Sequence, residues 1–164
     1  MIESEEKRIE EAVGLLRLHG KKVSTNLIAS LLIWLFGILV FIPLGESINI
    51  QTKTLVSLIF LFAFSLPIIW MFSPLRKLIN AFSVLPSKKL TRRGFTLENS
   101  QLLLQYSMFI ITGIIFYLLF SSFLFIIHPS INGITLIILL IWIFFLFLRT
   151  TTILLPRFLK WLLN

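Results

Sequence analysis

The sequence predicts an all-α, polytopic membrane protein in which four transmembrane helices form two tandem hairpins behind an N-terminal amphipathic cytoplasmic helix. Hydrophobic residues make up 57% of the 164 residues and charged residues only 13%, whereas about 25% are charged in soluble proteins. Mean hydropathy is +0.98. Residues 136–148 are an unbroken apolar run, too long for a strand, and indicate a span over 133–155. We therefore expect no separate soluble domain.

Residues 1–22 are predicted to form a cytoplasmic amphipathic helix of their own. Ile2, Ile9, Val13 and Leu16 recur at helical spacing, and glutamates crowd the first half. Gly20 is expected to end this helix. Five Glu balance five Lys and Arg through residue 22, so we expect the helix to lie against protein, either the molecule's own cytoplasmic face or a partner.

The next unit, 23–86, is predicted to contain the first hairpin, with spans at 23–42 and 54–73. Pro43 is expected to close the first span. Pro67 lies inside the second and is a candidate hinge, because a proline removes one backbone hydrogen bond and kinks the helix.

A helix that lies at the interface or continues into the cytoplasm is expected to follow Pro74 and to end at Pro86. A basic cytoplasmic connector at 87–100 leads to the second hairpin at 101–164. That hairpin is predicted to hold spans at 102–127 and 133–155 and a short interfacial helix after Pro156.

The distribution of positive charge predicts the orientation. Five Lys and Arg lie at 1–22, six at 74–100 and three at 149–164, which leaves Lys53 alone in the other loops. Cytoplasmic loops carry the excess of Lys and Arg, so both termini are expected in the cytoplasm and the protein in the cell membrane. This topology also accounts for most of the net charge of +8, and no nucleic acid partner is expected.

The two halves share a layout that suggests a duplication. Ser47-Ile48-Asn49 and Ser130-Ile131-Asn132 lie 83 residues apart, and a proline with basic residues follows each after a similar interval. Two hairpins that both enter from the cytoplasm would form a parallel repeat. Chance similarity in sequence this rich in Ile, Leu and Phe is the alternative.

Small and polar residues indicate how the spans pack, because membrane helices place such residues against one another. They gather on one face of the first span and one face of the third: Asn26, Ser30 and Gly37, and Tyr106, Gly113, Tyr117 and Ser121. We therefore expect spans one and three to meet, with spans two and four facing lipid or another subunit.

No catalytic, cofactor-binding or metal-binding residue is predicted. All seven carboxylates are Glu, and none falls within a predicted span. Proteolysis by paired acids, proton-coupled transport and magnesium-dependent lipid transfer all need acids at such depth. His19 and His128 are expected on opposite sides of the membrane, so they cannot share a metal. The chain has no cysteine, which excludes disulfides and thiolate sites.

A few cations are candidate contacts for lipid or a partner. Arg149 lies about 10 Å inside the expected end of span four, from a rise of about 1.5 Å per residue. It is expected to reach the headgroups, or else to bind a phosphate, a carboxylate or a permeating anion beside Thr150, Thr151 and Thr152. The connector supplies four further candidates, which are expected mainly to fix the orientation of the protein in the membrane: Lys88, Lys89, Arg92 and Arg93.

Two functions fit these observations. The first is a non-enzymatic accessory or scaffold subunit of a larger membrane complex, without a cofactor. The alternative is a small channel or transporter whose pathway forms between protomers, because four helices with so few polar residues hardly enclose a wet pore. The expected partners are the bilayer and other membrane subunits or further copies of the chain.

Overall fold

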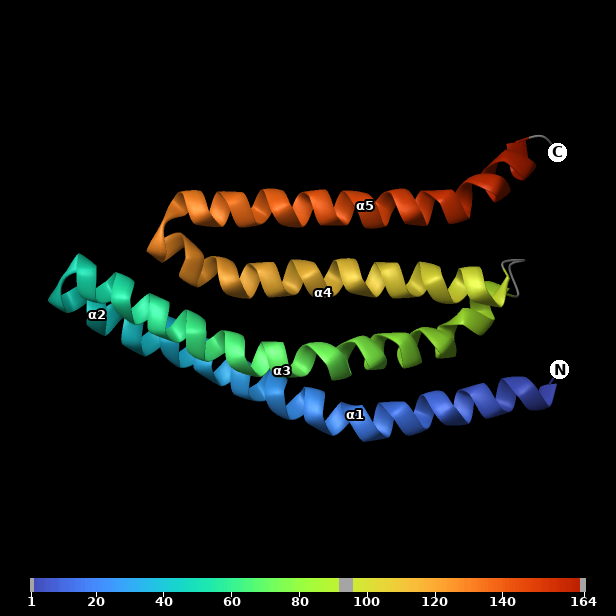
Figure 1. The fold of residues 1–164 in the computed structure, drawn as a ribbon, viewed down its shortest axis with the longest axis horizontal. Helices are drawn as coiled ribbons and strands as arrows, with labels where there is room; N and C mark the ends of the chain where they lie inside the picture. The colour runs from blue at the N-terminus through green and yellow to red at the C-terminus, as the bar shows by residue number, and fades with distance from the viewer. Residues whose placement is uncertain (1, 92–95, 163–164) are drawn as a thin grey trace.

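The computed structural model is all-helical over the residues that it describes, 2–91 and 96–162. In chain order the elements are α1 (Ile2–Phe36), the π-helical segment η1 (Gly37–Phe41), α2 (Ile42–Ile48), α3 (Ile50–Thr91), α4 (Leu97–Ile127) and α5 (Pro129–Leu162) (Figure 1). Four stretches are long and apolar enough to cross a membrane: Ile9–Ile48, Ile50–Val84, Leu97–Ile127 and Pro129–Leu155. The prediction of an all-α chain with four helices able to span a membrane is confirmed.

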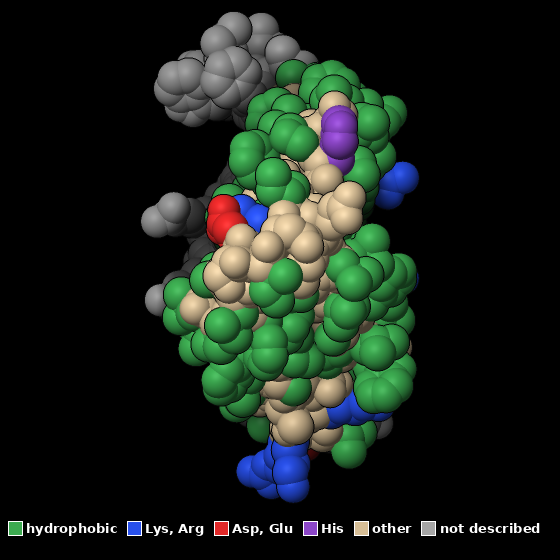
Figure 2. Space-filling model, turned by 90° about the vertical axis from the view of Figure 1, so that its left-hand side faces the viewer, with side chains coloured by type: hydrophobic (Ala, Val, Ile, Leu, Met, Phe, Trp, Pro, Cys, Tyr) green, Lys and Arg blue, Asp and Glu red, His purple; other side chains and the backbone are tan. Residues whose placement is uncertain are grey.

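The long helices lie side by side in the order α1, α3, α4, α5, and each runs antiparallel to the one before it (Figure 1). Extensive contacts within the described residues join α1 to α3, α3 to α4 and α4 to α5. Seen from the end that carries the turns, the molecule is elongated rather than round (Figure 2). The four helices therefore form an open row, and both termini lie at the same end of it.

The first helix differs from the prediction. α1 continues without a break from Ile2 through Gly20 into the first span, so the expected helix end at Gly20 is wrong. Glycine destabilises a helix interior by only about 1 kcal/mol relative to alanine, which the flanking residues can offset. The structure shows one long, largely apolar helix where we expected a separate amphipathic one.

Pro43 does not close the first span either, because helical structure continues through η1 into α2. The N–H of Ile42 donates to the carbonyl of Gly37, five residues earlier, which is the hydrogen bond of a π-helix. Pro43 follows at the start of α2 and has no N–H to donate. The wider π turn before it accommodates the hydrogen bond that the proline cannot make.

Three further prolines, Pro67, Pro74 and Pro86, lie inside α3. The expected helix boundaries at Pro74 and Pro86 are therefore wrong, and α5 likewise continues through Pro156. A proline bends a helix where neighbouring helices hold its two halves, and α3 visibly bends along its length (Figure 1). A hinge motion at Pro67 stays a prediction.

Each turn at the far end of the row consists of one extended residue. Asn49 separates α2 from α3, and its side-chain oxygen accepts hydrogen bonds from the backbone N–H and the hydroxyl of Thr52, at 2.7 and 2.8 Å. His128 separates α4 from α5, and its Nδ1 accepts from the N–H of Ser130 at 3.2 Å. Asn132, which the proposed repeat aligns with Asn49, instead lies inside α5. The two Ser-Ile-Asn triplets thus occupy different structural positions.

The core lies where α3 meets its two neighbours. Phe64 of α3 and Phe123 of α4 are fully buried, and Ile42 and Ile68 complete the buried cluster. The ring of Phe64 lies 4.9 Å from that of Phe120 and 5.8 Å from that of Phe123, between centroids. Aromatic pairs at such distances are favourable beyond the area they bury. The second span is therefore central, which corrects the expectation that it faces lipid.

The part of α3 beyond Pro74, expected at the membrane interface or in the cytoplasm, packs one face against the protein and leaves Arg76, Lys77 and Phe82 exposed. Ser83 and Ser87 of α3 and Ser100 of α4 are fully buried, and Ala81 nearly so. Small residues allow helices to approach closely. The last turns of α3 and the first turns of α4 accordingly converge at the end of the row that holds the termini (Figure 1).

Gly37 provides a test of the packing around α3. A Cβ atom there would come within 2.8 Å of Cδ1 of Phe60 and 3.2 Å of Cε1 of Phe123. We predict that Gly37→Ala destabilises the protein by about 1–3 kcal/mol, because both rings must shift. The midpoint of thermal denaturation in detergent measures this change.

Gly20→Ala is the matched control, since no heavy atom lies within 4 Å of the Cβ that it would add. It should be neutral or stabilising by up to about 1 kcal/mol, from helix propensity alone. Equal effects of the two substitutions would contradict the described packing.

Candidate functional site

The small and polar residues predicted on the first span lie on α1 and η1, and they face α3 more than α4. Ser30 is buried at 1% exposure, and its hydroxyl donates to the carbonyl of Asn26 at 2.8 Å. Gly37 is buried, and the ring of Phe60 in α3 occupies the space beside it. Asn26 is half-buried and lines a pocket between α1 and α3.

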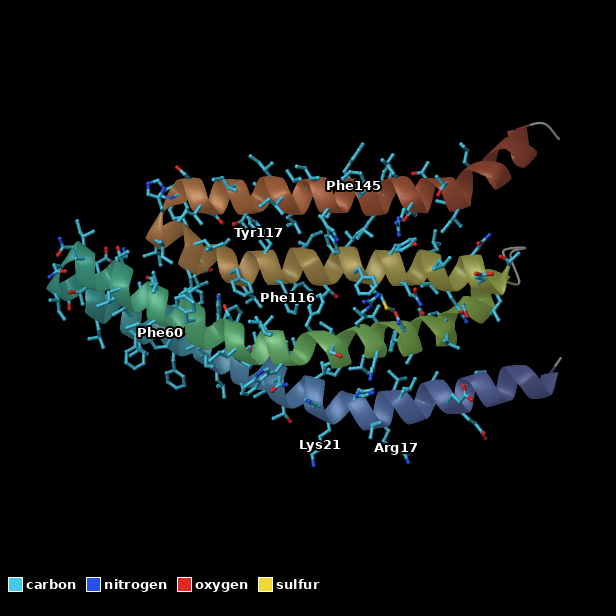
Figure 3. All side chains as sticks on the ribbon, viewed as in Figure 1. Arg17, Lys21, Phe60, Phe116, Tyr117 and Phe145 are labelled. Carbon is cyan, nitrogen blue, oxygen red and sulfur yellow. The ribbon has the colours of Figure 1, made fainter. Side chains whose placement is uncertain are left out.

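The residues predicted on the third span do not meet those of the first. A Cβ on Gly113 would lie 2.6 Å from Trp142 and 3.5 Å from Leu139, both in α5. Tyr117 lies between α4 and α5 (Figure 3) and lines a groove there. Tyr106 and Ser121 are half-buried on the same helix. The expected meeting of spans one and three through these small residues is corrected: α3 lies between α1 and α4 over most of their length.

Helices α1 and α4 do touch near the turn end, through a residue that the sequence analysis missed. The indole Nε1 of Trp34 donates to the backbone carbonyl of Leu119 at 3.1 Å. That carbonyl belongs to a continuous helix, so the hydrogen bond is additional to the helix's own pattern. A tryptophan whose N–H lies in a span needs a hydrogen-bond acceptor there. This requirement could have indicated from the sequence that Trp34 contacts another helix.

Arg149 was singled out as a lipid or partner contact. Arg149 of α5 is exposed and forms no ion pair within the part of the chain that the structure describes. The three threonine hydroxyls after it donate to carbonyls of their own helix, those of Leu146, Phe147 and Arg149. The threonines therefore have no hydroxyl proton left for a ligand of Arg149.

The basic connector lies mostly outside the described residues. Lys88 and Lys89 belong to the last turns of α3, but their side chains are outside the description, as are Arg92 and Arg93 altogether. Their predicted contact with lipid or a partner stays a prediction. Pro67 lies in the middle of α3 and is half-buried.

Among the described residues, the structure shows one ion pair. Glu46 and Lys53 form an ion pair at the turn end, with 2.9 Å between Oε1 and Nζ. No group of three His, Asp or Glu that could hold a metal occurs among the described residues. His19 lies in α1 and His128 at the opposite end (Figure 1). Polar groups along the spans mostly bond within their own helix, as Ser57 and Ser65 do.

Two hollows open on the surface. One, of about 340 Å³, lies between α4 and α5 and is walled mainly by apolar residues, among them Phe116, Leu139 and Trp142. The hydroxyl of Tyr117 has no hydrogen-bond partner within the described segments and is one of few polar groups there. The other, of about 420 Å³, lies between α1 and α3 and contains lysines. The first suits an apolar chain, and the second suits an anion.

Comparison with known proteins gives no family for this chain. Neither the protein-family models, nor the curated proteins, nor the solved structures include one that matches it.

Proposed function

We propose that the protein is a non-enzymatic accessory or scaffold subunit of a larger complex in the cell membrane, with both termini in the cytoplasm. The observation that carries this proposal is the open row of helices, in which α5 has extensive contacts with α4 alone among the described elements. No residue of the most apolar stretch of α5 is buried within the protein. An open row offers more surface to other helices than a closed bundle of the same length.

The exposed side of α5 carries large aromatic side chains. Phe144, Phe145 and Phe147 are 57%, 61% and 60% exposed, and the rings of the first two lie 6.3 Å apart. In a bilayer, helices associate through van der Waals packing rather than hydrophobic drive, so large rigid rings favour a protein neighbour that fits them. Another membrane-spanning helix would complete the layer that α5 now ends.

The interior supports a structural role. The hydroxyls of Ser30, Ser57, Ser65 and Thr135 donate to carbonyls of their own helices. They therefore line no continuous polar path across the described spans, and α1 to α5 would guide an ion or substrate only together with other chains. In this proposal α1–α3 and α4–α5 are the two tandem hairpins, and the N-terminal turns of α1 contact a partner in the cytoplasm.

The complex can be tested by purification of the full-length protein in mild detergent, followed by native mass measurement. We predict a defined complex with unrelated subunits. We also predict that Phe145→Ala lowers the fraction in that complex at least several-fold, because this large ring is 61% exposed on α5 and available to a partner. Phe72→Ala, at 63% exposure on α3, is the control and should leave the complex intact. A closed assembly of identical chains would favour the channel alternative, and a monomer would refute both.

The orientation has its own test, since the chain has no native cysteine. Ser47 is exposed next to the α2–α3 turn, and Gly20 has open space around it just before the apolar residues of the first span. We predict that a membrane-impermeant thiol reagent added to intact cells labels Ser47→Cys and does not label Gly20→Cys. The reverse result would invert the proposed topology.

A further inference from the structure

The pocket between α1 and α3 lies at the edge of the apolar part of the protein. Its wall consists of Leu18, Lys21, Lys22, Thr25 and Asn26 of α1 and Trp70 of α3, around a volume of about 420 Å³. Lys21 and Lys22 immediately precede the apolar residues of the first span. Figure 3 shows Lys21 and Arg17 extending from the side of α1 that faces away from α3 in this view, where their charged ends are open to the surroundings.

Trp70 places this level of the molecule at a membrane interface. Its side chain is 67% exposed, and Pro74, Arg76 and Lys77 follow it within two turns. Tryptophan is enriched where the hydrocarbon meets the headgroups, with its ring in the apolar layer and its N–H toward water. The pocket therefore opens at the depth of the lipid headgroups on the side that holds the termini.

The two ammonium groups of the pocket have no acidic partner in the described structure. The ion pair that the structure shows, Glu46 with Lys53, lies at the opposite end of the row. The hydroxyl of Thr25 donates to the carbonyl of Lys21 at 2.9 Å, and the side chain of Asn26 has no hydrogen-bond partner among the described residues. Its amide N–H groups are therefore available to an anion.

We propose that this pocket binds the phosphate group of an anionic phospholipid. Two lysines and an amide donor suit a phosphate oxygen cluster, because charge-assisted hydrogen bonds are the strong ones. Leu18 and Trp70 supply an apolar wall beside them, which a lipid's acyl chain covers and a soluble phosphate does not. An uncompensated pair of cations favours a headgroup with net negative charge over a zwitterionic one, whose own cation would be repelled.

The net charge of residues 1–22 does not indicate this site. That segment is neutral because five Glu balance five Lys and Arg, which argues against a membrane-binding helix. The glutamates, however, all lie at positions 3–11, and the lysines of the pocket lie at the other end, beside the first span. The electrostatic field at the interface is set by the nearby cations, since charges farther than about 8–10 Å are screened.

Native mass spectrometry of the full-length protein with phosphatidylglycerol and phosphatidylcholine of identical acyl chains tests the proposal. The wild type should retain phosphatidylglycerol preferentially. Lys21→Gln with Lys22→Gln should reduce that preference about thirtyfold, because each lysine near an anionic membrane surface contributes a factor of about five. The control, Arg76→Gln with Lys77→Gln, removes the same charge from exposed residues of α3 that do not line the pocket. It should reduce the preference several-fold less than the pocket pair does, because these cations would not hydrogen-bond to the bound phosphate.

Three outcomes would overturn the site. The wild type would retain both lipids equally, or the control pair would lose as much preference as the pocket pair, which would show only general surface charge. Alternatively, inorganic phosphate at the concentration of the lipid headgroups would displace phosphatidylglycerol, which would assign the pocket to a soluble anion. Because all four substituted residues are exposed, circular dichroism should show unchanged helix content in both double variants.

Discussion

The packing of Phe64 in α3 against Phe120 and Phe123 in α4 is the interaction on which the rest of the fold depends. Helices in a bilayer gain little from burying apolar surface, since lipid tails are as apolar as leucine. Close contact between rings therefore has to hold the row together, and Phe64 and Phe123 are the two largest side chains that are fully buried. Because Gly37 has no side chain, the ring of Phe60 packs directly beside its backbone, and the first span contacts the same cluster.

The short turns determine which helix lies outside that aromatic cluster. Asn49 and His128 each connect two antiparallel helices with one residue, so α3 must lie beside α1–α2 and α5 beside α4. Because α3 occupies the position between α1 and α4, α5 is left at the edge with a single extensive neighbour among the described helices. The apolar surface available to a partner, and with it the proposed scaffold role, follows from this order.

The sequence predicts which residues can enter the hydrocarbon, but it does not predict which face of each helix packs against protein. Apolar runs such as 136–148 determine which residues can enter hydrocarbon, and α3, α4 and α5 follow those runs. Lipid-facing and helix-facing positions are both apolar, however, so periodicity could not show that Phe64 is buried while Phe62, two residues earlier, is 65% exposed. Gly20, Pro43 and Pro86 predict helix ends because glycine and proline weaken a helix. In the structure the flanking residues offset the cost of Gly20, a π turn precedes Pro43, and α3 continues through Pro86.

The candidate sites show the same division. Gly37 is predicted from the sequence as a site of close approach, because a glycine in a span admits a neighbouring helix. Span three was the expected neighbour, and the structure shows that Phe60 of α3 lies beside Gly37 as well as Phe123 of α4. The α1–α3 pocket was not anticipated, because Lys22 and Trp70 are 48 positions apart and meet only through the antiparallel pairing of the two helices.

The central position of α3 is tested most directly by the stabilities of Phe64→Ala and Phe62→Ala in detergent or lipid. Phe64 is fully buried and Phe62 is 65% exposed, although they are the same residue type on the same helix. The described packing predicts a loss of about 3–5 kcal/mol for Phe64→Ala and less than about 0.5 kcal/mol for Phe62→Ala. Similar small losses for both would contradict it, because α3 would then face lipid on both sides.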